Sequence, residues 1–121
     1  MTENQNSKQY DLESRTFEFA KNVVVFCKKL PRNISNIEYI KQVVRSSGSV
    51  GANYIEANES LSKKDFIMRI KICRKEAKES IYWLRLITET NQVEFEKEGA
   101  MLSNESVELK KIFSSILDKS K

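Results

Sequence analysis

The sequence predicts an all-α protein, folded as an antiparallel up-down-up-down four-helix bundle. Only three glycines and one proline occur among 121 residues, which leaves little turn material for a β-rich fold. Apolar residues recur at gaps of three and four along four stretches of the chain, as they do on one face of a helix. The breaks between these stretches are short, and short connections place consecutive helices antiparallel. The length suits one domain with an ordinary core.

The first helix is predicted from about Asp11 to Leu30. Residues 1–10 are polar and carry no motif, so they are expected to form a disordered tail before a single domain over residues 11–121. Pro31 ends the helix, because proline disfavours helical geometry in the residue before it. The apolar stripe covers about half of the circumference, so this helix is expected to pack on two sides. The stripe consists of Leu12, Phe17, Phe19, Ala20, Val23, Val24, Phe26, Cys27 and Leu30.

The second helix has a strong predicted start. Ser35 is the expected N-cap, with Glu38 three residues later as the partner of a capping box. Ile34 and Tyr39 have the spacing of a hydrophobic staple across this start. The apolar pattern then continues to about Ser60, where the helix is predicted to end.

The third helix is predicted to begin immediately afterwards. Ser62 is the expected N-cap, Asp65 closes the capping box, and Leu61 and Phe66 have the spacing of a staple. The helical pattern continues to about Thr90. The connection between the second and third helices is therefore short, and the two are expected to form a helical hairpin.

The last helix is predicted from Ser103 or Asn104 to Lys119. Residues 92–102 are expected to form a loop with at most one helical turn, because Gly99 interrupts the pattern. The apolar face of this helix is formed by Leu109, Ile112, Phe113, Ile116 and Leu117.

Gly48 and Gly51 lie inside the second helix, where each glycine costs about 1 kcal/mol relative to alanine. We interpret them as sites where a neighbouring helix packs closely. A hinge or a ligand groove is the alternative.

Composition excludes several chemistries. Histidine is absent, which removes His-based acid–base catalysis and the histidine ligands of di-iron bundles. Cys27 and Cys73 fall on apolar faces without CxxC spacing, so we expect reduced core residues rather than a disulfide. No catalytic group, metal or cofactor is predicted. The chain has no apolar run of membrane-spanning length and no signal-peptide pattern, so we expect a cytoplasmic protein that does not enter the membrane.

A polar seam runs beside the apolar seam of the second helix at the same helical spacing. We expect it to form an oligomer contact or an internal packing surface, with a small-molecule pocket as the alternative. An apolar flank on the third helix is a second candidate for an oligomer or packing interface. The seam and Arg45 beside it comprise Gln42, Arg45, Ser46, Ser49, Asn53 and Glu56, and the flank comprises Met68, Ile72, Trp83 and Ile87.

The third helix also concentrates positive charge. Residues 62–91 contain eight Lys or Arg and four Asp or Glu, so their surplus equals the net charge of +4 of the whole chain. This pattern is consistent with a strip that contacts phosphates and carries one stacking aromatic, and the alternative is a solvated helix face. The candidate nucleic-acid contacts are Lys71, Arg74, Lys75, Lys78, Tyr82 and Arg85.

Part of the chain resembles a known family. The residues that carry the resemblance are Arg45, Ser49, Val50, Ala52, Asn53, Glu56, Ala57, Ser62, Lys64, Asp65, Phe66, Ile72, Glu76, Ala77, Glu79 and Leu84. They resemble the bacterial four-helix-bundle family of 23S rRNA intervening-sequence proteins. The resemblance implies a small cytoplasmic bundle, often a homopentameric ring, with no established catalytic activity. Because it falls on Arg45, Glu56, Glu76 and Glu79 together, it also implies that Arg45 and Glu56 pair with charges on the third helix, either within or between subunits. A related accessory protein of diversity-generating retroelements forms a basic barrel that contacts nucleic acid and a reverse transcriptase.

Two functions follow as hypotheses. The first is a non-enzymatic homo-oligomeric bundle that binds RNA or DNA through the basic face of the third helix. The second is a structural scaffold that docks a protein partner through its apolar flank.

Overall fold

The structure is a computed structural model that describes residues 2–121, with side chains from Leu12 onward. Over these residues it contains four α-helices and one short 3-10 helix, and it has no strand. The elements are α1 (Thr2–Lys29), α2 (Ile34–Asn58), α3 (Lys63–Thr90), the 3-10 helix η1 (Val93–Phe95) and α4 (Glu96–Lys119). The predicted all-α class is confirmed.

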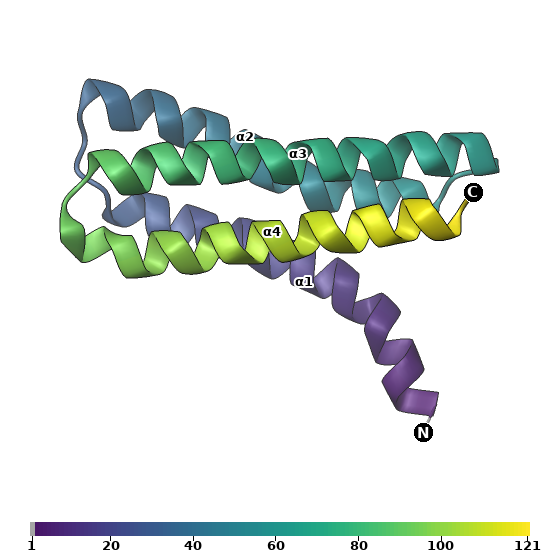
Figure 1. The fold of residues 1–121 in the computed structure, drawn as a ribbon. Helices are drawn as coiled ribbons and strands as arrows, with labels where there is room; N and C mark the ends of the chain where they lie inside the picture. The colour runs from purple at the N-terminus through teal and green to yellow at the C-terminus, as the bar shows by residue number, and fades with distance from the viewer. Residues whose placement is uncertain (1) are drawn as a thin grey trace.

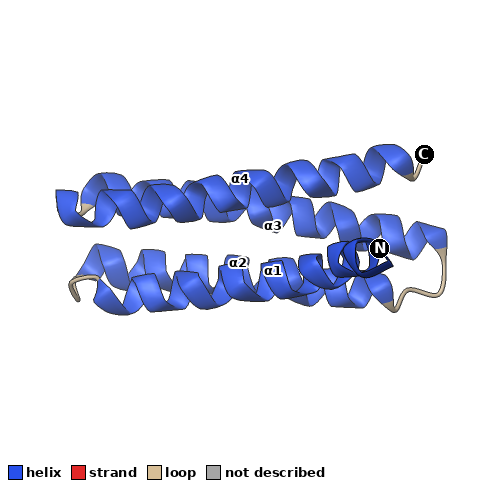
Figure 2. Cartoon of the chain, turned by 90° about the horizontal axis from the view of Figure 1, so that it is seen from below, coloured by secondary structure: helices blue, strands red, loops and turns tan. Residues whose placement is uncertain are grey.

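The helices lie in two layers, with α1 beside α2 and α3 beside α4 (Figure 2). The α1–α2 and α3–α4 connections are at one end of the molecule, and the α2–α3 connection is at the other (Figure 1). Apolar side chains from all four helices meet between the layers and form one core. Its fully buried aromatic and large aliphatic members include Phe19, Phe26, Val23, Val43, Val50, Ile70, Leu84, Ile87, Leu109 and Phe113.

The start of α1 differs from the prediction. The sequence favoured a helix from about Asp11, whereas the structure is helical from Thr2. Figure 1 shows the first turns of α1 pointing away from the other three helices. Met1 and the side chains of residues 1–11 lie outside the described part of the chain, so the disorder predicted for residues 1–10 stays a prediction. The predicted end of α1 is confirmed at Lys29.

The predicted cap of α2 was wrong. Asn33 is the N-cap, and its Oδ1 accepts a hydrogen bond from the backbone N–H of Asn36 at 2.8 Å. Ser35 lies inside the helix, and Ile34 is 86% exposed, so neither the capping box with Glu38 nor the staple forms as predicted. Asparagine caps as well as serine does. Asn36 lies in the first turn of this helix, and its buried side chain forms hydrogen bonds with Pro31 and Asn91.

Two asparagines join the α1–α2 connection to the end of α3. Asn36 is 1% exposed, and its Nδ2 donates to the carbonyl of Pro31 and to Asn91 Oδ1, both at 2.8 Å. Asn91 Nδ2 returns a hydrogen bond to Asn36 Oδ1 at 2.9 Å and also donates to the carbonyl of Ile87 at 2.9 Å. This reciprocal pair satisfies the buried amide of Asn36 and the half-buried amide of Asn91, and it holds three segments together.

The predicted cap of α3 is confirmed. Ser62 is the N-cap, and its Oγ accepts a hydrogen bond from the backbone N–H of Asp65 at 3.1 Å. The helix ends at Thr90, as predicted. The staple with Phe66 was wrong, because Leu61 is fully exposed at the tip of the α2–α3 connection.

Helix α4 begins earlier than predicted. It starts at Glu96 rather than near Ser103, and Gly99 lies buried within its first turns. A Cβ atom at Gly99 would lie 2.2 Å from Oγ1 of Thr88 on α3. The glycine therefore does not break the helix. It lets α4 approach α3 closely.

The two glycines of α2 behave differently. A Cβ atom at Gly51 would lie 2.9 Å from Oγ1 of Thr16, so this glycine serves the close packing of α1 that the sequence predicted. Gly48 has nothing within 4 Å of such a Cβ atom, so close packing was the wrong prediction for this residue.

The cysteines belong to the core. Cys27 and Cys73 are both free and buried, which confirms the prediction of reduced core residues. Burial raises the pKa of the Cys27 thiol to about 11 and that of Cys73 to about 12. Both thiols are therefore neutral at physiological pH and are not activated as nucleophiles.

Candidate nucleic-acid and docking surfaces

The predicted polar seam of α2 lies against α3 of the same chain. Ser46 is fully buried, and its Oγ forms a hydrogen bond of 2.8 Å with Ser80 Oγ. Asn53 Oδ1 accepts a hydrogen bond from Arg69 Nη1 at 3.0 Å. Gln42 and Ser49 are half-buried, and Glu56 is exposed. The seam therefore contributes to packing within one subunit, while the oligomer contact stays a prediction.

Arg45 connects α2 to two carboxylates of α3. Its Nη1 donates to Glu76 Oε1 at 3.3 Å, and its Nη2 donates to Glu79 Oε2. Glu76 is 7% exposed, so the guanidinium neutralises a charge that water hardly reaches. The hydrogen bond to Glu79 raises the pKa of Arg45. These ion pairs lie within one subunit, whereas the family resemblance left open whether they form within or between subunits. Glu56 forms no ion pair with another residue among residues 12–121.

Glu79 is also held from within α3. Trp83 Nε1 donates to Glu79 Oε2 at 3.0 Å, and this bond is the main cause that lowers the pKa of Glu79. The hydrogen bond from Arg45 lowers the same pKa further, against the opposing effect of burial. Glu79 is consequently an anion in the folded protein at neutral pH.

Three aromatic rings form a row at the α2–α3 edge. Tyr39 and Trp83 have ring centroids 6.1 Å apart, and Tyr82 meets Trp83 edge-to-face at 5.0 Å. Tyr82 is 60% exposed, whereas Tyr39 and Trp83 are half-buried. The other predicted flank residues do not share one environment, because Met68 is exposed, Ile72 is half-buried and Ile87 is fully buried in the core.

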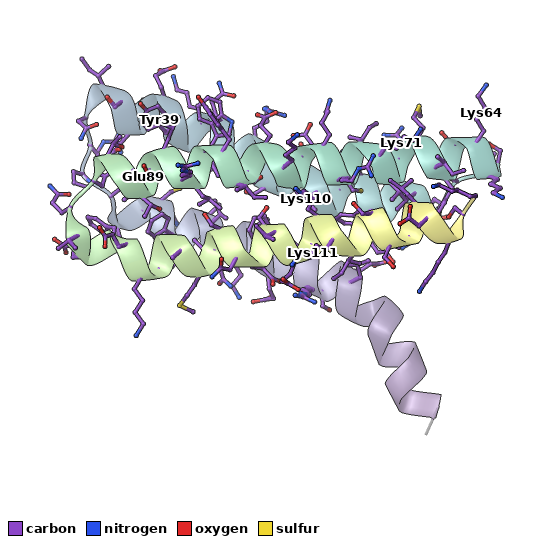
Figure 3. All side chains as sticks on the ribbon, in the orientation of Figure 1. Tyr39, Lys64, Lys71, Glu89, Lys110 and Lys111 are labelled. Atoms are coloured by element: carbon purple, nitrogen blue, oxygen red, sulfur yellow. The ribbon has the colours of Figure 1, made fainter. Side chains whose placement is uncertain are left out.

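The predicted basic residues line the outer side of α3. All except the half-buried Arg74 are exposed, and Figure 3 looks onto the layer that carries them, with Lys71 labelled. Arg85 Nε contacts Glu89 Oε2 at 2.8 Å, a hydrogen bond that raises the pKa of Arg85. We call this set the basic strip, and it consists of Lys71, Arg74, Lys75, Lys78, Tyr82 and Arg85.

The sequence reasoning missed a groove between α1 and α2. This groove has a volume of about 370 Å³ and lies on the layer opposite the basic strip. Apolar side chains line most of it, and three cationic side chains border them. The apolar residues are Val24, Cys27, Leu30, Ile37, Ile40 and Val44, and the cationic ones are Lys28, Arg32 and Lys41. We call it the α1–α2 groove. The wide apolar stripe of the first helix, expected to pack on two sides, was the signal that could have located it.

The described residues offer neither a metal-binding cluster nor a membrane-spanning helix. Within the described residues, His, Cys, Asp and Glu do not gather in groups of three that would hold a metal ion. No described helix carries an apolar stretch long enough to cross a lipid bilayer.

Replacing Arg45 by alanine is expected to lower the free energy of unfolding by about 1–2 kcal/mol at neutral pH, because Glu76 would remain largely buried without its partner. The free energy of unfolding should also depend on pH through Glu79. The folded-state pKa of Glu79 lies below its ordinary value of 4.5, so Glu79 contributes stability above pH 4.5 that is lost as the pH falls through the lowered value.

Urea unfolding at neutral pH and at a series of values below pH 4.5 tests this expectation. The acid-induced loss of stability should be smaller in Arg45→Ala than in the wild type, since the variant lacks one of the bonds that lower the Glu79 pKa. Parallel pH profiles for the two proteins would contradict the assignment.

Fold and surfaces together define a small helical-bundle protein with a basic strip on one layer and an apolar groove on the other. The family model of the 23S rRNA-intervening sequence proteins matches residues 8–115. The chain belongs to this family, which confirms the resemblance noted in its sequence. A search of curated proteins finds no match.

One solved structure illustrates the similarity. It is the crystal structure of a protein of unknown function from the S23 ribosomal protein family of Bacteroides thetaiotaomicron VPI-5482. The two chains are 32% identical, and the match covers 88% of this chain and 97% of the other, with a TM-score of 0.77.

Proposed function

We propose that the chain is a non-enzymatic, homo-oligomeric helical bundle that binds RNA or DNA through the basic strip of α3. The strip is the observation that carries this proposal. Lys71, Lys75 and Lys78 are exposed on successive turns of its outer side. Such an array attracts a phosphate backbone without regard to base sequence.

The lysines of the strip are not paired with carboxylates, a state that they share, among residues 12–121, with other lysines such as Lys28, Lys64 and Lys97. Several surface lysines elsewhere lie within 4.0 Å of a carboxylate, among them Lys21, Lys29 and Lys111. Among residues 12–121, Lys71 and Lys78 have no such ion pair. Their charge is therefore available to an external anion.

The proposal includes the assembly. The four helices form an antiparallel up-down-up-down bundle, supported by the short connections between them. Copies of this bundle assemble in the cytoplasm as a homopentameric ring, as the family resemblance implies. The α1–α2 groove supports self-association, because exposed apolar grooves commonly mark interaction surfaces. A ring would repeat the basic strip, so weak single sites would combine into useful avidity.

A scaffold without nucleic-acid binding is the second candidate. The same groove favours it, and the same two helices expose further apolar side chains, with Phe17 of α1 64% exposed and Ile55 of α2 51% exposed. In this case a protein partner would occupy the groove.

A filter-binding titration against structured RNA and duplex DNA over a salt series tests the first candidate. We expect the logarithm of the association constant to fall linearly with the logarithm of the salt concentration. Replacing Lys78 by alanine should reduce that slope by about 1, as expected for the loss of one phosphate contact. Lys21→Ala, which removes a lysine on α1, is the matched control and should leave the slope unchanged.

Negligible affinity at low salt for structured RNA, for duplex DNA and for a single-stranded oligonucleotide alike would refute the first candidate and leave the scaffold. Size-exclusion chromatography with light scattering tests the assembly separately. A monomer at micromolar concentration would argue against the ring.

A further inference from the structure

We infer that the basic strip recognises unpaired RNA or DNA, with Tyr82 as the platform on which a base stacks. This inference rests on the proposed function and specifies its ligand. The strip does not read a duplex groove.

Tyr82 lies between the last two cationic side chains of the strip. Lys78 is four residues before it and Arg85 is three residues after it, so the three lie on one side of α3 within adjacent turns. The ring is 60% exposed. A single strand that follows the lysines would therefore pass an accessible aromatic face, the combination that single-strand binding proteins use.

The Tyr82 ring packs against an ordered neighbouring ring. It meets Trp83 edge-to-face, with ring centroids 5.0 Å apart. Trp83 is in turn held by its hydrogen bond to Glu79 and by contact with Tyr39, and Arg45 holds Glu79. Because this chain of contacts already orders the support, binding costs less conformational entropy than it would for a freely rotating side chain. Arg45 and Glu79 thus act as positioning residues.

The packing of α3 disfavours groove recognition in a duplex. Ser80 contacts Ser46 of α2, and the carbonyl of Ala77 accepts a hydrogen bond from Ser106 of α4 at 2.7 Å. With a helix packed on each side, α3 exposes only its outer ridge and cannot enter a major groove as a free recognition helix does. The bases of a duplex are already stacked on one another, so Tyr82 gains a partner only where a base is unpaired.

The exposed acid Glu89 beside the strip does not block it. Glu89 pairs with Arg85, and their side chains are 63% and 76% exposed. An exposed pair of this kind contributes little stability. Arg85 can therefore exchange this carboxylate for a phosphate.

Fluorescence anisotropy with labelled oligouridylate and with a duplex of equal length tests the inference in the full-length chain. We expect wild-type protein to bind oligouridylate more tightly than the duplex. Tyr82→Ala should weaken oligouridylate binding roughly 5- to 100-fold, the range expected for losing one stacked base, and should leave duplex binding within about twofold. Tyr82→Phe, which keeps the ring, should bind oligouridylate like the wild type.

Met101→Ala is the matched control, because it shortens a side chain that is 63% exposed on α4 and should change neither affinity. Circular dichroism on each variant confirms that the fold is retained. Equal binding of both probes, with Tyr82→Ala behaving as wild type, would overturn the inference while the proposed function stands. Absence of binding to either probe at low salt would instead remove the proposed function, and the inference with it.

Discussion

Replacing Asn36 by alanine is expected to destabilise the protein by about 2–4 kcal/mol, since the change removes three hydrogen bonds and leaves buried groups unpaired. The carbonyl of Pro31 would lose its donor, and the Asn91 amide would lose both halves of the reciprocal pair. The free energy of unfolding from urea denaturation measures the effect.

Asn36→Asp separates hydrogen bonding from side-chain volume. The aspartate has nearly the same shape, but its carboxylate cannot donate to Pro31 O or Asn91 Oδ1, so we expect a loss at least as large as that of alanine. Asn104→Ala removes an exposed asparagine on α4 and should cost less than about 0.5 kcal/mol. A loss below about 1 kcal/mol in Asn36→Ala would show that the pair does not hold the helix ends together.

Gly99→Ala is expected to destabilise the protein by about 1–3 kcal/mol, although alanine is the better helix former. The new methyl group would lie 2.2 Å from Thr88 Oγ1, and Thr88 Cγ2 is also close, at 3.3 Å. Rotating the threonine away would sacrifice the 2.7 Å hydrogen bond from its Oγ1 to the carbonyl of Leu84. Either α4 moves outward or that bond breaks.

Thermal and urea unfolding of a double-mutant cycle measure this clash directly. Thr88→Ala removes Oγ1 and Cγ2 and keeps only Cβ, at 3.2 Å from the new methyl group. Adding Gly99→Ala to Thr88→Ala should therefore cost much less than adding it to the wild type. Gly48→Ala is the matched control, because nothing lies near its new methyl group, and it should stabilise α2 by about 0.5–1 kcal/mol. Equal effects at Gly99 and Gly48 would rule out close packing as the reason for the buried glycine.

The accuracy of the predicted helix boundaries depends on how local their causes are. The cap at Ser62 and the end of α3 at Thr90 follow from residues within a turn, and both were predicted correctly. The cap of α2 was misplaced by two residues, because Asn33 and Ser35 are both good caps. The α2 start also depends on Asn91, a partner at the far end of α3.

The two candidate surfaces also differ in how far the sequence alone could predict them. The basic strip was predictable, because the spacing of its side chains along one helix places them together in any helical conformation. The α1–α2 groove was not located, because it requires residues from two helices and depends on how far apart those helices pack. The polar seam of α2 was visible as a pattern, but the Ser46–Ser80 contact emerged only from the packed structure. The family resemblance already suggested that Arg45 pairs with Glu76 and Glu79, and the structure showed that these pairs form within one subunit.

Helical periodicity, the scarcity of turn residues and the family pattern were sufficient to predict the fold class and family of this chain, because each is encoded over short distances along it. The early start of α4, the Asn36–Asn91 pair and the placement of the Arg45 ion pairs within one subunit required the packed molecule. Asn36 and Asn91 are 55 residues apart in the chain. Their hydrogen bonds exist only once burial of the apolar stripes has brought the helices together, so no local pattern could have predicted them.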